Sequence, residues 1–362
     1  MFSTGFRRTD TLVYSAFTNH RSRKDNTMEL TVKKGTNISH WLSQSTVRGE
    51  KRREFFTERD VEKIAALGFD HIRLPIDEEQ MWDEAGRRES EAFELLENAL
   101  DWTDRHGLKI IVDLHILRSH YFNDKTEPRL YSDPAEQRRF VDLWLDLSQF
   151  MRARPVRNVA YEFLNEAVAR DHEKWNELSG MVFAALRETE PERVFVLGSN
   201  NFNSVHTYDA LRVPKDDNLI LTFHYYHPML VTHCQARWWD GGEYAGPVTY
   251  PGSPIPADHF ATLDDETKAK LEKQNAPFDR EVMRREIAKP VAVARKHGYP
   301  IYCGEFGCYN KTPEPLRDMW YRDVLAVFDE YSVGWANWDY KGNFGLVDHD
   351  LAETPVATYL TR

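Results

Sequence analysis

The sequence has little cysteine and no long apolar run. Its 362 residues include three cysteines, Cys234, Cys303 and Cys308. An odd number without paired spacing gives neither a disulfide framework nor a zinc-binding pattern. No stretch approaches the roughly 18 consecutive apolar residues that indicate a transmembrane helix. These absences exclude a small disulfide-stapled protein and argue against a membrane-spanning one.

Basic residues are also in deficit. Lysine and arginine total 47 against 58 aspartates and glutamates, so the formal net charge is −11 and the pI is near 5.7. The field of such a chain repels phosphate backbones and anionic lipid headgroups. We therefore expect neither a nucleic-acid nor a membrane partner.

The first residues lack the apolar segment of a secretory signal. Residues 1–27 also show no hydrophobic periodicity, so we expect a weakly ordered N-terminal extension there and one domain over 28–362. The missing signal favours a cytoplasmic location. A wrongly assigned start would give the same appearance, and secretion stays open for that reason.

Apolar content is sufficient for a large core, with 41% hydrophobic and 13% aromatic residues. Short β-like runs alternate with longer amphipathic segments. The runs are residues 31–39, 71–76, 109–115, 158–166, 193–200, 219–226, 300–307 and 332–340. Several are nearly continuous apolar runs, which is typical of parallel strands buried on both faces. Eight such units predict an α/β protein with a (β/α)₈ TIM barrel. The alternative, a doubly wound open sheet, lacks its Gly-rich loop after the first strand.

Polar side chains close most of the predicted strands. They are Asn37, Arg73, His115, Asn165, Glu166, Asn200, His224, Tyr226, Glu305 and Trp338. The C-terminal strand ends of a barrel form its active site. Glu166 and Glu305, at the ends of strands four and seven, would face the same bowl. Two facing carboxylates are the groups that hydrolyse glycosidic bonds.

Six motifs carry a family resemblance. They are "HIRLPID", "VDLH", "YEFLNEA", "FHYYHP", "YCGEFG" and "GWANWDY". In this order and spacing, from about Lys33 to Val347, the chain resembles glycoside hydrolase family 5, which includes many cellulases and mannanases. The family usually has proline after the acid/base glutamate, where this chain has Ala167, and that leaves the loop geometry in doubt.

The resemblance implies a retaining glycosidase that needs neither metal nor cofactor. It implies that Glu166 is the general acid/base and Glu305 the nucleophile. The remaining implied contacts to substrate or nucleophile come from Arg73, His115, Asn165, His224, Tyr226 and Trp338. A large loss of activity on adding a chelator would contradict the expected absence of a metal.

The residue types suit these roles. A guanidinium such as Arg73 near Glu305 lowers the pKa of that carboxyl, and Tyr226 can donate a hydrogen bond to it. Burial and the charge of Glu305 raise the pKa of Glu166, so that Glu166 holds a proton to deliver. Asn165 can bond the sugar 2-hydroxyl, and an indole such as Trp338 offers a flat apolar face to the ring.

Two other interpretations remain. His115, His120, His224 and His227 with Asp113 could ligate a metal in a barrel hydrolase. That set leaves the paired glutamates unexplained, and no H-x-H closes the first strand. A protein of another class, a catalytically inactive carbohydrate-binding barrel, would be expected to lack one of the two glutamates.

The sugar is not fixed by these motifs. A β-1,4-glucan or cello-oligosaccharide is the first expectation, and a mannanase or mannosidase acting on β-mannan is the second. Residues 227–282, rich in Trp, Pro, Gly and Tyr, predict a structured loop after strand six that packs over the mouth. We expect Trp238 or Trp239 to reach the sugar, whereas Trp41 and Trp82 fit a sugar platform and a core equally well. Endo or exo action and the oligomeric state stay open.

Overall fold

A computed structural model of the chain describes residues 30–362. The predicted extension over residues 1–27 lies outside the described residues. Eight strands form one closed parallel barrel in sequence order. They are β1 (Lys34–Asn37), β2 (His71–Asp77), β3 (Lys109–Ile116), β4 (Val159–Glu162), β5 (Val194–Gly198), β6 (Leu219–Tyr225), β7 (Ile301–Phe306) and β8 (Gly334–Asn337). β8 closes the ring by pairing with β1, so the predicted (β/α)₈ barrel is confirmed.

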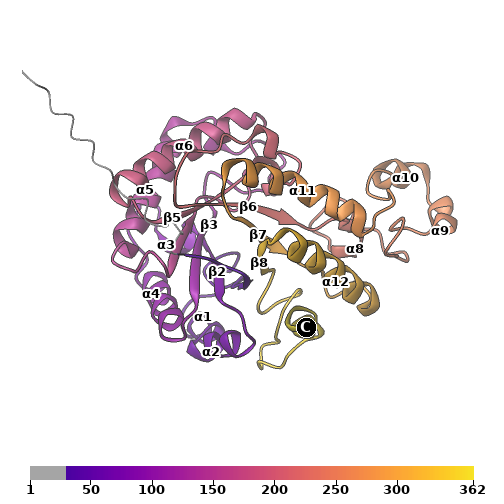
Figure 1. Cartoon of the computed structure of the whole chain (residues 1–362), viewed down its shortest axis with the longest axis horizontal. Coiled ribbons are helices and arrows are strands. Elements are labelled where there is room, and N and C mark those ends of the chain that lie inside the picture. The colour runs from indigo at the N-terminus through magenta and orange to yellow at the C-terminus, as the bar shows by residue number, and fades with distance from the viewer. Residues whose placement is uncertain (1–29) are drawn as a thin grey trace, which may run out of the picture.

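Helices surround the barrel (Figure 1). They are α1 (Glu50–Phe55), α2 (Glu58–Ala66), α3 (Glu78–Met81), α4 (Ser90–Arg105), α5 (Pro134–Met151), α6 (His172–Thr189), α7 (Asn200–Asn203), α8 (Met229–Thr232), α9 (Ala257–Thr262), α10 (Asp265–Leu271), α11 (Arg280–His297), α12 (Glu314–Tyr331) and α13 (Pro355–Thr361), with 3₁₀ turns η1 (Arg129–Tyr131) and η2 (Tyr208–Ala210). An aspartate caps the start of three long helices: Asp133, Asp171 and Asp279 each accept a bond from a first-turn N–H. No helix within 30–362 combines the length and apolar character needed to cross a bilayer.

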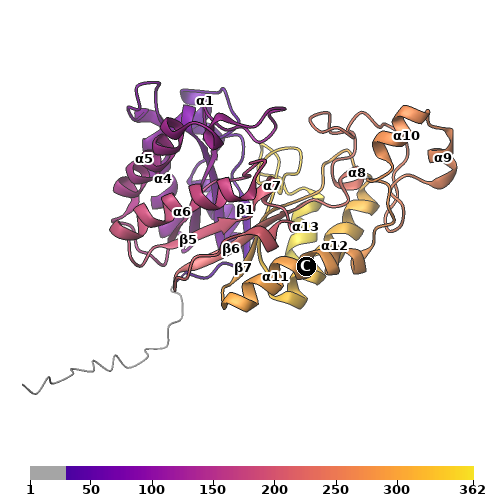
Figure 2. The ribbon, with the colours of Figure 1, turned by 90° about the horizontal axis from the view of Figure 1, so that it is seen from above.

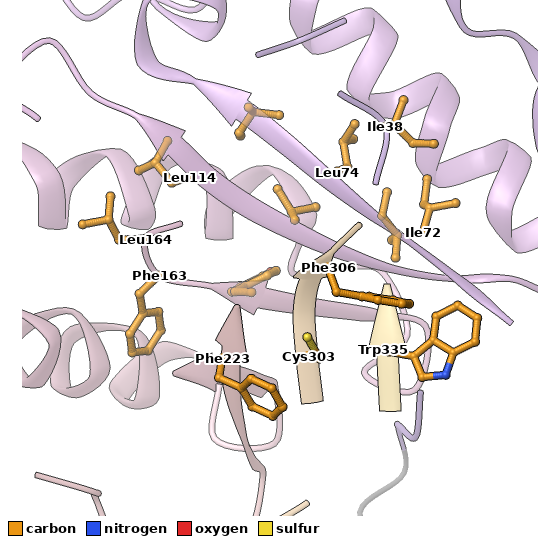
Figure 3. Close-up of a cluster of buried hydrophobic side chains, with 14 of the residues drawn as sticks. Ile38, Ile72, Leu74, Leu114, Phe163, Leu164, Phe223, Cys303, Phe306 and Trp335 are labelled. Carbon is orange, nitrogen blue, oxygen red and sulfur yellow. The ribbon is translucent and has the colours of Figure 1, made fainter. Parts of the chain in front are cut away.

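The main core lies between the strands and the helices. Figure 3 shows part of it, with side chains of several strands pointing away from the barrel interior toward the helix layer. Leu74 of β2, Phe223 of β6 and Trp335 of β8 are among its buried members. Alternate residues of a strand face opposite sides. The other face of each strand is therefore free to line the inside of the barrel.

The barrel interior has an apolar floor and a charged layer above it. Ile111, Ala160 and Ile220 belong to a separate buried cluster. Two residues further along β3 and β4 the same inward face carries Asp113 and Glu162, both buried. Burying carboxylates there requires charged or hydrogen-bonding partners, since an isolated buried ion is strongly disfavoured.

An insertion, residues 228–279, separates β6 from α11. It carries α8, α9 and α10 and extends from one side of the barrel in both views (Figures 1 and 2). A small core of its own includes Leu230, Tyr244, Ile255 and Leu271. The predicted structured loop is thus confirmed, although α11 begins at Arg280 and the loop ends before residue 282.

The fourth strand is shorter than the sequence predicted. β4 ends at Glu162, so Asn165 and Glu166 lie on the loop that follows it. Neighbouring elements satisfy this loop's polar backbone: the indole of Trp144 donates to the carbonyl of Phe163 at 2.9 Å. Backbone bonds to both neighbouring strands continue into the loop: the N–H of Phe163 donates to the carbonyl of Val196 at 3.4 Å, and the N–H of Asn165 donates to that of Leu114 at 3.3 Å. The catalytic candidate therefore lies on a short, buried loop and not on a strand end.

Candidate active site

The C-terminal ends of the strands surround a hollow of about 1280 Å³. Most of the predicted site residues line it: His115, Asn165, Glu166, His224, Tyr226, Glu305 and Trp338. Arg73, which was also predicted, is fully buried and does not line the hollow. It contacts Glu305 from the barrel interior. The topology brings these residues together because consecutive parallel strands end at one rim.

Glu166 and Glu305 form the centre of the hollow. A carboxylate oxygen of each lies within 4.8 Å of the other and of a nitrogen of His224. Nδ1 of His224 is 2.8 Å from Oε1 of Glu166 and 3.6 Å from Oε2 of Glu305. Retaining glycosidases place their carboxyl groups roughly 5–5.5 Å apart and inverting enzymes roughly 6.5–9.5 Å apart. The spacing here is of the retaining kind.

Arg73 holds Glu305 from the barrel side. Its Nη1 donates to Oε1 of Glu305 at 2.8 Å, and Nε and Nη2 donate to the carboxylate of Glu162 at 2.7 and 3.1 Å. Nη2 also lies 3.1 Å from Oδ2 of Asp113 and 2.9 Å from Oδ1 of Asn165. One guanidinium of β2 thus binds residues of β3, β4, β7 and the loop after β4.

The single charge of Arg73 does not balance the carboxylates around it. Burial raises the pKa of Asp113 to about 7 and that of Glu162 to about 7, although Arg73 acts in the opposite direction on both. Near neutral pH the cluster therefore shares protons among its carboxyls. This sharing limits the number of uncompensated charges inside the barrel.

The two central carboxyls differ in their surroundings. Burial raises the pKa of both, and the charge of Glu305 raises that of Glu166 further. At Glu305 the nearby Arg73 and the hydroxyl of Tyr226, which donates to Oε2 at 2.9 Å, oppose the rise. Arg73 lowers the pKa of Glu305, as the sequence predicted, but burial outweighs it and the net pKa lies above the ordinary glutamate value. Glu305 still ionises first of the two.

His115 connects the charged layer to the wall of the hollow. Its Nδ1 is 2.6 Å from Oδ2 of Asp113, and its ring stacks on Trp338 with centroids 5.7 Å apart and planes 8° apart. Nε2 lies 3.3 Å from the amide nitrogen of Gln44. Burial lowers the pKa of His115 to about 4, so the imidazole is neutral at working pH. It holds the indole of Trp338 in place.

The insertion supplies two tryptophans to the hollow. Trp238 and Trp239 both line it. Trp238 is 52% exposed and packs edge-on against Tyr309 at 5.0 Å, and Nε1 of Trp239 donates to the carbonyl of His233 at 3.0 Å. The insertion therefore lines the hollow with both indoles, from the side of the barrel on which it extends. Their contact with sugar stays a prediction.

Trp41 and Trp82 belong to the core. Both are 1% exposed. The indole N–H of Trp41 donates to the carbonyl of Arg52 at 2.8 Å, and that of Trp82 donates to Oδ2 of Asp146 at 2.8 Å. Neither indole is exposed to a sugar ring. Both tryptophans are therefore core residues and not sugar platforms.

The predicted alternative metal set is not brought together. Two groups of three side chains within residues 30–362 have ligand atoms close enough to share an ion. One is Glu166, His224 and Glu305, and the other is His206, His227 and Glu286. His120 and Asp113 are in neither group. The metal-hydrolase interpretation therefore loses its geometric basis.

Two residues of the site were not predicted from the sequence. Glu162 is a carboxylate inside the apolar run of β4, and its need for a buried partner could have flagged it. Gln44 reaches the hollow from the loop after β1, where its backbone N–H donates to Asp77 at 2.6 Å. Nothing in the sequence around Gln44 indicates this position.

Ala167 does not disturb the loop that carries Glu166. It is buried, and its carbonyl accepts a bond from the backbone N–H of Phe202 at 3.0 Å. Two residues on, the N–H of Ala169 donates to Oδ1 of Asn200 at 2.9 Å. These bonds anchor the loop to the segment after β5, and proline is not needed to fix it.

Comparison with known proteins agrees with this geometry. The model of the cellulase family, glycosyl hydrolase family 5, matches residues 32–344. Endoglucanase C of Acetivibrio thermocellus is 32% identical over 314 residues, covering 85% of this chain and 91% of the relative. Cellodextrinase A of Ruminococcus flavefaciens is 28% identical over 302 residues, with 83% of each chain covered.

Solved structures share the fold. Thermotoga maritima Cel5A in complex with cellobiose superposes with a TM-score of 0.73 at 23% identity, covering 91% of this chain and 97% of the other. The same enzyme in complex with mannotriose gives 0.74 at 22% identity, covering 92% and 98%. The family match spans most of the chain and includes both central glutamates. The chain therefore belongs to glycosyl hydrolase family 5, the cellulase family.

Proposed function

We propose that the protein hydrolyses β-1,4-glucan chains with retention of configuration. The observation that carries the proposal is the pair Glu166 and Glu305, whose carboxylate oxygens lie within 4.8 Å of each other. Of the two, Glu305 is the one that accepts a hydrogen bond from Arg73. This difference in surroundings separates the roles of the two groups. Glu305 acts as the nucleophile and Glu166 as the acid and then the base.

The reaction has two displacements. In the first, an oxygen of Glu305 attacks the anomeric carbon while Glu166 gives its proton to the departing glycosidic oxygen, leaving a glycosyl ester on Glu305. In the second, Glu166 takes a proton from water, the water oxygen attacks the anomeric carbon, and the ester bond to Glu305 breaks. Tyr226 and Arg73 hold the Glu305 carboxylate during attack. Asn165, which lines the hollow, bonds the sugar 2-hydroxyl in this proposal.

The names of relatives support a β-1,4-glucan as substrate. The relatives reported above are an endoglucanase and a cellodextrinase. The structural neighbour was solved with both cellobiose and mannotriose, so a mannan-derived substrate is tested beside the glucan. Cello- and manno-oligosaccharides of matched length, with the products followed by proton NMR, provide the test. The proposal expects faster cleavage of the cello-series and a β-configured first product. Faster mannan cleavage overturns the choice of sugar, and an α-configured first product overturns the mechanism.

The pH dependence of kcat/KM is expected to be bell-shaped. Activity rises as Glu305 loses its proton, at a pH above the ordinary glutamate range because burial raises its pKa. Activity falls at higher pH as Glu166, whose pKa is raised further by burial and by Glu305, loses the proton it must donate. The two apparent values belong to the coupled pair. With an activated aryl glycoside, Glu166→Gln should remove the alkaline limb, and a persisting limb would contradict the assignment.

Removing the acid should affect substrates unequally. Glu166→Ala is expected to slow oligosaccharide cleavage by roughly 10²–10⁴-fold, because an alkoxide leaves poorly without a proton. The first step with a dinitrophenyl leaving group should change little. Azide should then give a β-glycosyl azide from the ester on Glu305. Equal slowing of both substrates would contradict this role.

The exposed indole of Trp238, in the insertion, should contribute to substrate binding. Trp238→Ala is expected to raise KM for long cello-oligosaccharides by about three- to tenfold, since a ring–sugar contact has the size of an aromatic pair. The kcat for an aryl monoglycoside should stay unchanged. Met181→Ala is the control, because Met181 is 41% exposed on α6 and does not line the hollow. An unchanged KM in Trp238→Ala would remove the indole from the binding surface.

A further inference from the structure

A second group of potential metal ligands lies beside the hollow, and two of its three residues line it. His206 follows α7, His227 follows β6, and Glu286 is on α11. One ligand atom of each lies within 4.8 Å of the other two. The hydrolytic steps proposed above use none of these three side chains, so the group needs another explanation.

The carboxylate of Glu286 joins the two imidazoles. Its Oε2 is 3.0 Å from Nδ1 of His227, and its Oε1 is 3.4 Å from Nε2 of His206. Two ligand atoms bound to one tetrahedral zinc ion at ~2.0–2.2 Å lie roughly 3.3 Å apart. The two separations run from different oxygens of Glu286, and each is close to the separation of two ligands that share an ion.

An outer hydrogen bond orients the carboxylate. Tyr225, 1% exposed, donates from its hydroxyl to Oε2 of Glu286 at 2.8 Å. Metal-binding carboxylates are commonly fixed by such a donor.

An ion can reach the group from solvent. The side chains of His206 and His227 are 39% and 36% exposed, and both residues line the hollow. Nζ of Lys289 lies 2.9 Å from Nδ1 of His206. Its charge opposes a bound cation, and because the lysine is exposed it can move aside.

We propose that His206, His227 and Glu286 bind one divalent transition-metal ion of the zinc class. Two imidazole nitrogens and one carboxylate oxygen are a ligand set that zinc accepts, with a fourth position left for water. The ion connects the segment after α7, the end of β6 and α11. It takes no part in the two-carboxylate chemistry, so the proposal goes beyond the proposed function and does not depend on it.

Titration of the untagged chain with zinc chloride, followed by calorimetry, tests the site. The wild type is expected to bind one ion, and Glu286→Gln and His206→Ala should each weaken binding by at least about tenfold. Lys289→Gln should tighten it by roughly three- to tenfold, because a nearby positive charge is removed. Cobalt added in place of zinc should give visible absorption bands that Glu286→Gln abolishes.

A matched control separates this site from the catalytic pair. Glu166, His224 and Glu305 form the other described group that could hold an ion. Glu305→Gln should keep zinc binding at the wild-type affinity. Wild-type affinity in Glu286→Gln, loss of binding in Glu305→Gln, or no binding at millimolar zinc would each overturn the proposal. Lys289→Gln changes an exposed residue and should not disturb folding. It therefore still tests the site if a variant of one of the three ligand residues fails to fold.

Discussion

Glu305→Ala is expected to lower turnover by roughly 10⁴–10⁶-fold, because without the carboxylate no glycosyl ester forms. Azide added to this variant should restore part of the activity. The small anion fits where the carboxylate was and attacks the anomeric carbon from the same side. The product should then be a glycosyl azide of inverted, α configuration, which proton NMR identifies.

The control for this experiment is Glu305→Gln. Its amide fills the space that azide needs, so azide should not rescue it. A β-configured azide from Glu305→Ala would mean that the roles of Glu166 and Glu305 are reversed. Substantial activity without azide would mean that Glu305 does not attack the sugar at all.

Arg73→Gln is expected to lower the free energy of unfolding by about 3–5 kcal/mol, the usual cost of removing one partner from a buried ion pair. Arg73 is fully buried between Asp113, Glu162 and Glu305. Its removal leaves these carboxyls without a cation in the barrel interior. Chemical denaturation followed by circular dichroism measures the effect, and hydrolysis should be lost as well.

Two further variants make this result specific. Arg53→Gln removes an exposed pair with Glu94, whose side chains are 37% and 54% exposed, and should leave stability unchanged within error. Arg73→Lys keeps the charge but not the planar fork of donors, so it should recover part of the stability and little of the activity. Equal midpoints for Arg73→Gln and wild type would contradict the network described here.

The fold was predictable because it depends on a repeated pattern. Apolar runs of strand length alternated with amphipathic segments eight times, and every one of the eight became a barrel strand. Strand ends were less predictable. The apolar run continues past Glu162, and the N–H groups of Phe163 and Asn165 still donate to the neighbouring strands β5 and β3. The regular ladder of β4 nevertheless ends at Glu162, and the apolar pattern alone does not mark that boundary.

The site was predictable where the fold itself collects residues. Glu166, Glu305 and the polar residues near the strand ends share one rim because parallel strands start and stop together. The net pKa of Glu305 was not predictable. Burial raises it, Arg73 and Tyr226 lower it, and the sequence does not give the balance between these effects. The tryptophans show the same limit. Trp82 and Trp238 both lie in polar surroundings in the sequence, and only packing distinguishes the buried one from the exposed one.

The insertion divides the chemistry between two pieces of chain. Arg73 and Glu166 precede residues 228–279 and Glu305 follows them, so a backbone cut inside the insertion places the acid and the nucleophile on separate polypeptides. The two pieces would meet along β6–β7 and β8–β1. Neither alone holds both carboxylates. A chain opened at this position is thus a split enzyme, in which sugar release reports that two separately made fragments have found each other.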